Sequence, residues 1–342
     1  MESIRYAVPG PTGPAAGTPA RRPHSVRRTT THDSLREHGT DGPVTAIALG
    51  RDLYTSRTGE ASVLAAVRLE ATSQFPGHIL TSIGTDPVDD RVRQLTGKRA
   101  SAGFRRAVEA ALPGEREAGT LLYQVLDDLP TALLVSGYAT LAATVTSGGP
   151  VPPPGRSPAM ALQVVDMCSG WVDGGVMVSG LNEGRLPYFE GTVAPGGLEG
   201  AGDPLGWHAH GPLPAHAMRR RRRLDVWPGA GLAHVEAFFR DSHVAADRVE
   251  RVVHEYTVRA TVDMATRTFC QCQADFGSLP WPECPGALAS AGRLAGVSVD
   301  GLRRRVREDF TGVGTCTHLN DTLRALEDVS ALIDVLDGQS RG

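Results

Sequence analysis

The sequence lacks any apolar run long enough to cross a membrane, and residues 1–22 lack the apolar core of a secretory signal. It also lacks an excess of charge of one sign, because 35 basic and 38 acidic residues give a formal net charge of −3. No G-x-G-x-x-G loop follows a strand-like segment, and no P-loop is present. These absences predict a cytoplasmic protein that binds neither membranes nor nucleic acid and whose substrate is a small molecule. Residues 1–24, rich in Pro, Gly and Ala, are expected to form a disordered tail.

Cysteine is scarce and unevenly placed. The chain has five cysteines, an odd number that does not suit a framework of disulfides. Reduced thiols are therefore expected. Four of the five follow residue 269, which directs attention to the end of the chain.

A length of 342 residues predicts two domains, and similar features recur in the same order on both sides of a Pro- and Gly-rich segment at 147–158. The matches, in order, are V-R-R-T at 26–29 with the arginine run and L-D-V at 219–226, A-L-G-R-D at 48–52 with A-F-F-R-D at 237–241, A-A-V-R-L at 65–69 with Y-T-V-R-A at 256–260, L-T-G at 95–97 with L-A-G at 294–296, G-F-R-R-A-V at 103–108 with G-L-R-R-R-V at 301–306, and G-T at 119–120 with G-T at 314–315. A shared order of this kind indicates an internal repeat. We expect a first copy at 25–146, a linker with a small ordered island (160–178) at 147–217, a second copy at 218–332 and a tail at 333–342.

Each half shows strand patterns followed by helix patterns. Residues 250–263 alternate, with His254 and Tyr256 on one face and Arg259 and Asp263 on the other, and residues 268–274 form a partner strand. Helices are expected at 286–295, at 299–310 with Ser298 as N-cap, and at 317–326. The fold class is therefore α+β: two pseudo-symmetric copies of an antiparallel sheet followed by helices, joined by a Pro/Gly-rich linker.

The second copy holds residues that could carry chemistry. Cys284 and Cys316 each precede a predicted helix, and His318 follows two residues after Cys316. A thiol at a helix N-terminus is expected to have a lowered pKa, and thiolate is the form that binds metal or attacks carbon. With a fourth ligand from His254, Asp263, His243 or Asp241, the set would suit zinc or iron.

Three interpretations of this cluster stay open: buried packing residues, a metal site, or a cysteine nucleophile with histidine as base. In the first copy Asp86 stands near the place of Cys284, and Leu121 and Tyr123 stand at the places of Cys316 and His318. Because leucine and tyrosine are much larger than cysteine, this difference favours a function confined to the second copy.

The leading hypothesis is a metal-dependent lyase or hydrolase. Cys284, Cys316 and His318 would bind the metal, and Asp263 and His254 would act as catalytic residues. Arg259 would bind substrate, unless it forms a structural ion pair as its counterpart Arg68 would. The alternatives are a non-catalytic metal or iron–sulfur carrier and a metal-free cysteine enzyme. The oligomeric state stays open.

Several further features have two interpretations each. The run Arg219 to Arg223 predicts an exposed edge strand or an anion site, and Asp127 and Asp128 predict helix-end residues or an acid–base pair. Cys270 and Cys272 are expected to share one strand face as core residues. The histidines His208, His210 and His216 are expected on an unstructured surface loop or on a loop over the site, and Cys168 has no assigned role.

The second half resembles an uncharacterised bacterial family, one of the numbered domains of unknown function. The resemblance rests on C-T-H-L at 316–319, preceded by H-E-Y-T-V-R-A-T-V-D and W-P-E-C-P-G, and covers about residues 218–332. The two-copy form, with L-D-D-L-P and L-V-S-G-Y-A within 126–139, looks like an actinobacterial branch. More remotely, Cys284 with the following glycine- and arginine-containing stretch, and Cys316 later, resembles NifU-type iron–sulfur scaffold domains, except that those have a third cysteine at a hairpin turn.

Overall fold

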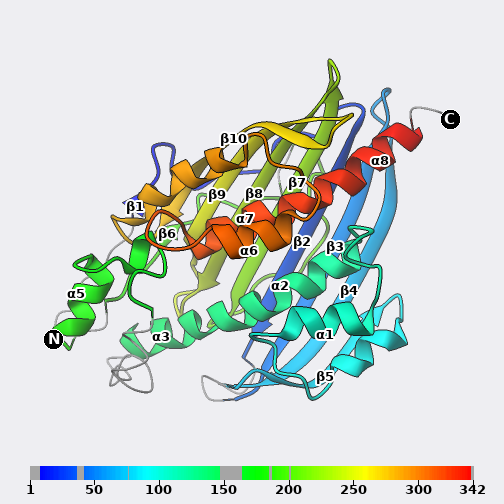
Figure 1. Ribbon diagram of the computed structural model, residues 1–342. Helices are drawn as coiled ribbons and strands as arrows, with labels where there is room; N and C mark the ends of the chain where they lie inside the picture. Colours follow the sequence, from blue (N-terminus) through cyan, green and yellow to red (C-terminus); the bar gives the residue numbers. More distant parts are fainter. Residues whose placement is uncertain are drawn as a thin grey trace.

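One antiparallel sheet runs through the whole protein (Figure 1). The computed structural model describes residues 8–36, 42–75, 77–146, 164–184, 187–199 and 202–339. The ten strands follow the order β1-β10-β9-β8-β7-β2-β3-β4-β5, with β6 paired to β9. None of the helices in these ranges is long and apolar enough to cross a membrane.

The elements of the first half are strands and then helices. They are β2 (Ser25–Leu35), β3 (Val44–Thr55), β4 (Ala61–Gln74), β5 (Ile79–Asp86), the 3-10 helix η1 (Asp90–Leu95), α1 (Phe104–Ala111), α2 (Leu121–Val135) and α3 (Gly137–Thr146).

The second half follows the same order. It contains β7 (Met218–Gly229), β8 (Leu232–Val244), β9 (Glu250–Asp263), β10 (Thr268–Leu279), the 3-10 helix η3 (Cys284–Leu294), α6 (Leu302–Asp309), α7 (Thr317–Ala325), η4 (Leu326–Asp328) and α8 (Val329–Gln339). Among the described residues, four short elements lie outside the two halves: β1 (Val8–Pro9), η2 (Ser169–Trp171), α5 (Val176–Asn182) and β6 (Thr192–Val193).

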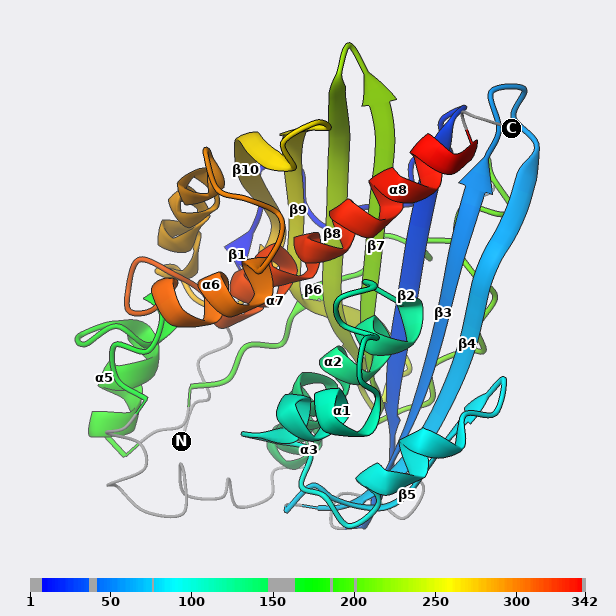
Figure 2. The same cartoon turned by 45° about the vertical axis from the view of Figure 1, so that its right-hand side comes forward.

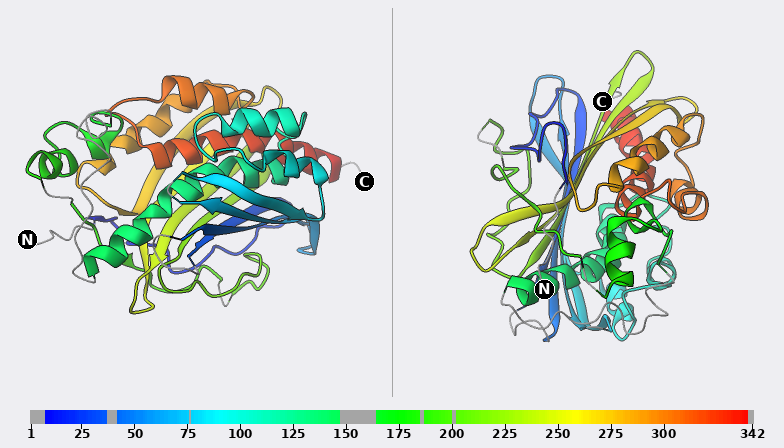
Figure 3. Two further views of the ribbon diagram at one scale, coloured as in Figure 1. Left: turned by 90° about the horizontal axis from the view of Figure 1, so that it is seen from below. Right: turned by 90° about the vertical axis from the view of Figure 1, so that its left-hand side faces the viewer.

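The two halves meet through their first strands. β2 pairs antiparallel with β7 over nine residue pairs from Val26↔Val226 to Ser34↔Met218, and Thr30 lies opposite Arg222 near the middle. Instead of two separate domains, the halves therefore share one sheet. The helices of both halves cover one face of it, with α1 and α2 beside α6 and α7 (Figure 3).

The alternation of apolar residues along the strands explains why the helices cover one face of the sheet. In β9, Tyr256, Val258, Ala260 and Val262 are buried in the second-half core, which they share with η3, α6, α7 and α8. The predicted strand at 250–263 is confirmed as β9, and its alternation from Tyr256 to Val262 directs these side chains to the helices. The helix expected from residue 299 begins at Leu302 instead, because its N-cap Gly301 adopts a left-handed conformation (φ 76°).

The opposite face of the sheet is covered by irregular chain. Residues 10–24 and 202–216 lie against it, as the views in Figure 3 show. Arg240 donates to the carbonyl of Ala15, and Arg27 donates to the carbonyl of Gly206. Residues 8–24 are thus part of the folded protein, which corrects the tail expected there, and residues 1–7 lie outside the described residues. The tail expected at 333–342 is helix through Gln339, with Ile333 and Leu336 buried.

The arginine run lies in the middle of the sheet. Arg219 to Arg223 belong to β7, between β8 and β2, and all five are buried, so the edge-strand interpretation is wrong. Each guanidinium pairs with a carboxylate, which makes its burial tolerable. The pairs are Arg219–Asp33, Arg220–Asp241, Arg221–Glu250, Arg222–Asp128 and Arg223–Asp225.

Candidate functional site

Three potential metal ligands converge where β8, β9 and the first turn of α7 meet. Asp241 lies opposite His254 in the β8–β9 pairing, and α7 places His318 above them. One donor atom from each residue lies within 4.8 Å of the other two, and no other such set of three occurs among the described residues. The imidazoles of His254 and His318 are stacked with ring centroids 3.6 Å apart. This set can offer two nitrogens and one oxygen to a cation.

Both imidazoles are held neutral, the form that binds metal. Burial lowers the pKa of His318 to about 3, and the cation of Arg220 acts in the same direction. Burial also lowers the pKa of His254 well below its usual value, with a further lowering from His318. Nδ1 of His254 is buried and has no hydrogen-bond partner among the described residues. A buried nitrogen without a partner is costly, and a bound cation would satisfy it.

Asp241 is fixed by Arg220. Nε and Nη2 of Arg220 each donate to one oxygen of Asp241 at 2.9 Å. Nη1 of Arg220 lies 3.2 Å from Asp321, on the same helix as His318. A bidentate arginine fork sets the carboxylate plane and leaves further lone pairs free. Arg220 therefore orients one ligand directly and contacts the helix that carries another.

An aromatic shell surrounds the histidines. Phe189 lies edge-on to His254 at 6.2 Å and to Trp281 at 5.2 Å, and Phe239 lies 6.3 Å from His318. His318 nevertheless keeps 19% of its side-chain area exposed. The three potential ligands are therefore largely buried, but His318 remains partly accessible to solvent.

The sequence-predicted thiols gather beside this set in a second cluster. Tyr256 donates a hydrogen bond from its hydroxyl to Sγ of Cys316 at 3.2 Å. Cys284 and Cys168 are near enough to interact electrostatically with Cys316. A Cβ on Gly170 would lie 2.8 Å from Sγ of Cys284. The island residue Cys168 therefore packs against the second half.

Burial decides the state of these thiols. It raises the pKa of Cys168 to about 11 and raises that of Cys284 further. At Cys316 burial also raises the pKa, although the hydroxyl of Tyr256 and the backbone N–H groups of Leu319 and His318 counteract it. The lowered pKa expected at these helix starts is therefore wrong, because the loss of water outweighs the helix terminus.

The remaining predicted site residues fall in different places. His318 and His254 are brought together, and Cys284 and Cys316 are not part of a three-donor set with His318. Asp263 ends β9 and accepts hydrogen bonds from the backbone N–H groups of Ala265 and Thr266 in the following turn. Arg259 is exposed on the opposite face of β9 and pairs with Glu236 and Asp275.

Two further histidines are buried away from this set. His208 bridges the hydroxyls of Thr29 and Thr31 at 2.8 and 3.0 Å, so it is not an unstructured surface residue. His243 is buried, and its Nε2 contacts the carbonyl of Glu190. His208 therefore helps to pack residues 202–216 against β2, and His243 connects β8 to residues 187–199.

The two cysteines of β10 differ in exposure. Cys270 is exposed while Cys272 is buried, although the sequence predicts both in the core. A bulge in β10 between Phe269 and Gln271 breaks the alternation and separates their environments.

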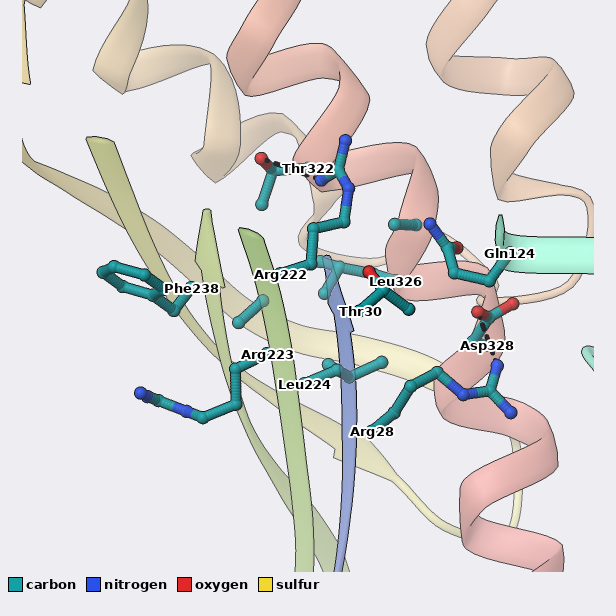
Figure 4. Close-up of a pocket in the computed structure, with 12 residues that line it drawn as sticks. Arg28, Thr30, Gln124, Arg222, Arg223, Leu224, Phe238, Thr322, Leu326 and Asp328 are labelled. Atoms are coloured by element: carbon teal, nitrogen blue, oxygen red, sulfur yellow. Dashed lines mark hydrogen bonds and ion pairs between the residues drawn. The ribbon is translucent and has the colours of Figure 1, made fainter. Parts of the chain in front are cut away.

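A small cavity lies between the sheet and the helices near the centre of β2–β7 (Figure 4). In the close-up Arg222 points toward Thr322 and Arg28 toward Asp328, while Arg223 points to the other face of the sheet. The volume of this cavity, about 20 Å³, is too small for an organic substrate.

The geometry thus defines an α+β protein with a candidate mononuclear metal centre in its second half. Residues 218–332 match the model of a family described as Protein of unknown function (DUF2889). The matched stretch starts at β7 and ends in α8, so it corresponds to the second half, as the resemblance to an uncharacterised family predicts. Neither a curated protein nor a solved structure matches the chain.

Proposed function

We propose that this protein is a metal-dependent enzyme that binds zinc or iron with Asp241, His254 and His318 and acts on a small organic substrate. The main observation behind this proposal is that one donor atom from each of the three residues lies within 4.8 Å of the other two. Two histidines and one carboxylate are a ligand set typical of catalytic zinc and of non-haem iron, since three protein ligands leave positions open. A metal held there would polarise a substrate oxygen or activate water, as a lyase or hydrolase requires.

We also propose that the two halves are diverged copies of one unit. The register shifts directly after Asp52 in the β3–β4 pairing and directly after Asp241 in the β8–β9 pairing, and in each case the extra residue lies in the second strand of the pair. Each of these aspartates accepts a bidentate arginine from the adjacent first strand, Arg28 in one half and Arg220 in the other. The left-handed N-cap Gly103 of α1 likewise matches Gly301 of α6.

These matching positions in the two halves support a metal site in the second copy alone. Ala65 lies opposite Asp52, where His254 lies opposite Asp241. Thr120 and Cys316 occupy the N-cap positions of α2 and α7, so Leu122 stands at the place of His318. Aligning the two N-caps moves the counterparts of Cys316 and His318 by one residue, from Leu121 and Tyr123 to Thr120 and Leu122. Asp86 ends β5 whereas Cys284 begins η3, so these two residues do not occupy matching places. The first copy retains the Arg–Asp pair and has neither histidine.

Elemental analysis of protein purified under reducing conditions tests the proposal. We expect about one zinc or iron per chain, lost in Asp241→Asn and His318→Gln. Asp52→Asn is the matched control, because it breaks the equivalent buried pair with Arg28 and leaves the histidines intact. A wild-type chain that neither contains metal nor takes up added zinc or iron would overturn the metal site.

A cobalt-substituted protein tests the catalytic part of the proposal. An open coordination position predicts that azide changes the visible cobalt spectrum. An unchanged spectrum at saturating azide would indicate a closed, structural site, which contradicts an enzymatic role while leaving the metal site intact.

The clustering of Cys168, Cys284 and Cys316 favours a second candidate, a thiolate-bound metal or iron–sulfur carrier. This candidate agrees with the remote resemblance to NifU-type domains, with Cys168 arriving from the island as a third thiol. It predicts that Cys284→Ser and Cys316→Ser abolish metal binding and that His254→Gln does not. A metal-free cysteine nucleophile is disfavoured, because all three thiols are buried with raised pKa values.

A further inference from the structure

A second, strongly basic site lies on the helix-covered side of the protein. A cleft of about 600 Å³ opens between α1 and the start of α2 in the first half and α6 and α7 in the second. Figure 2 shows α1 and α6 next to each other on this side of the sheet. Seven arginines and two carboxylates, Glu109 and Asp127, line the cleft, a formal excess of five positive charges.

The two carboxylates are already used by neighbouring groups. Asp127 is buried and contacts Arg105 at 2.7 Å, Arg303 at 3.6 Å and Arg324. Glu109 accepts a hydrogen bond from Tyr123 at 3.0 Å. Glu109 also pairs with Arg116 at 3.8 Å, so neither acid is paired with Arg106, Arg304 or Arg307.

Three guanidinium groups of the cleft remain unpaired. Within the described part of the chain, Arg106 of α1 and Arg304 and Arg307 of α6 have no carboxylate partner, and all three are exposed. Deeper in the cleft, Arg303 is 4% exposed and its Nε has no hydrogen-bond partner among the described residues. Like charges held this closely repel one another, so a bound anion would stabilise the folded state.

The size and chemistry of the cleft indicate its ligand. Its volume lies within the range of small-molecule sites. Guanidinium forks match phosphate oxygens bidentately, and several forks favour an anion with more than one phosphate group. The only aromatic side chain in the lining is that of Tyr123, which is buried against Arg303, so no exposed ring is present to stack a base.

We propose that this cleft binds a small polyphosphate anion through arginines contributed by both halves. The site is separate from the Asp241–His254–His318 set and goes beyond the enzymatic function proposed above. Recognition is of linked phosphate groups, whether these are free or carried by a nucleoside.

Calorimetric titration with inorganic tripolyphosphate, at fixed ionic strength, tests this proposal. We expect saturable binding of one anion per chain, weakened about tenfold or more by the double variant Arg304→Ala/Arg307→Ala. Arg305→Ala is the matched control, since Arg305 is exposed on the same helix, lies outside the cleft and should leave binding unchanged. A similar affinity for a nucleoside triphosphate would indicate that the cleft recognises the phosphate groups alone. A much higher affinity would indicate that the phosphate groups it binds are those of a nucleotide.

Three results would overturn the proposal: no saturable binding of tripolyphosphate, equal weakening by Arg305→Ala, or affinity that grows with the length of an oligonucleotide in place of one-to-one binding. Metal content, measured on the same samples, should be unaffected by the arginine variants, so this test is independent of the metal site.

Discussion

The carboxylate of Asp127, on α2 of the first half, lies 3.6 Å from Nε of Arg303, on α6 of the second half. Arg105 and Arg324 contact the same carboxylate, and the three cations hold the pKa of Asp127 well below its usual value although burial alone would raise it. One buried acid thus neutralises cations from both halves.

Asp127→Asn should therefore strongly destabilise the protein. Removing one partner from a buried ion pair leaves uncompensated charge and costs about 3–5 kcal/mol. Urea unfolding measures this loss. Asp309→Asn, which removes an exposed partner of Arg305 at 3.9 Å, should change the unfolding free energy by less than about 0.5 kcal/mol. Equal effects of the two variants would contradict the role given to Asp127.

Stability should fall as the pH is lowered from about 6.5 to about 3. Burial lowers the pKa of His208 to about 3, and a neighbouring His210 acts in the same direction. Above pH 6.5 the histidine is neutral in both states. Below it the unfolded chain binds a proton that the folded chain does not, so stability falls by about 1.4 kcal/mol per pH unit. His208→Gln should flatten this dependence in urea unfolding at pH 7 and pH 4.5, and an unchanged slope would contradict it.

Thiol labelling should single out Cys270. Cys270 is exposed, whereas Cys272 is buried and its pKa is raised to about 12 by burial. With iodoacetamide at pH 8, mass spectrometry should find Cys270 modified first and the four buried cysteines only after unfolding. Faster labelling of Cys284 or Cys316 than of Cys270 would revive a cysteine nucleophile.

Gly170→Ala should disturb the thiol cluster. The added Cβ would lie 2.8 Å from Sγ of Cys284 and 3.1 Å from Cδ1 of Trp281. Overpacking of this kind costs about 1–3 kcal/mol, measured as a lower midpoint in thermal unfolding. Gly286→Ala is the control, because nothing lies within 4 Å of its added Cβ. If both variants unfold like the wild type, the close packing of Gly170 on Cys284 is wrong.

The strands were the most predictable part of this fold. The alternation at 250–263 is confirmed as β9, since burial on one face imposes a period of two. The shared sheet was not predictable, because the pairing of β2 with β7 depends on long-range contacts that no local pattern encodes. The central place of Arg219 to Arg223 was missed for the same reason: composition indicates solvent exposure, and only the carboxylates on other elements permit burial.

The candidate site was predicted in part. The sequence indicates His318 and His254, but it also places Cys284 and Cys316 with His318, because each cysteine precedes a predicted helix. Asp241 was named only as one of several fourth ligands. The proposed duplication singles out Asp241, because Ala65 faces Asp52 whereas His254 faces Asp241. The match of residues 48–52 with 237–241 is visible in the sequence, but the register shift and the helix cap that bring His254 and His318 to Asp241 are not.

The pairing of β2 with β7 within one chain allows the two halves to differ in sequence. In a symmetric dimer of identical chains every substitution appears twice, once on each side of the axis. Here both strands belong to one chain, so their association is intramolecular and does not depend on protein concentration. A substitution can then alter one half alone. An ion held by Asp241, His254 and His318 would therefore have a stoichiometry of one per chain.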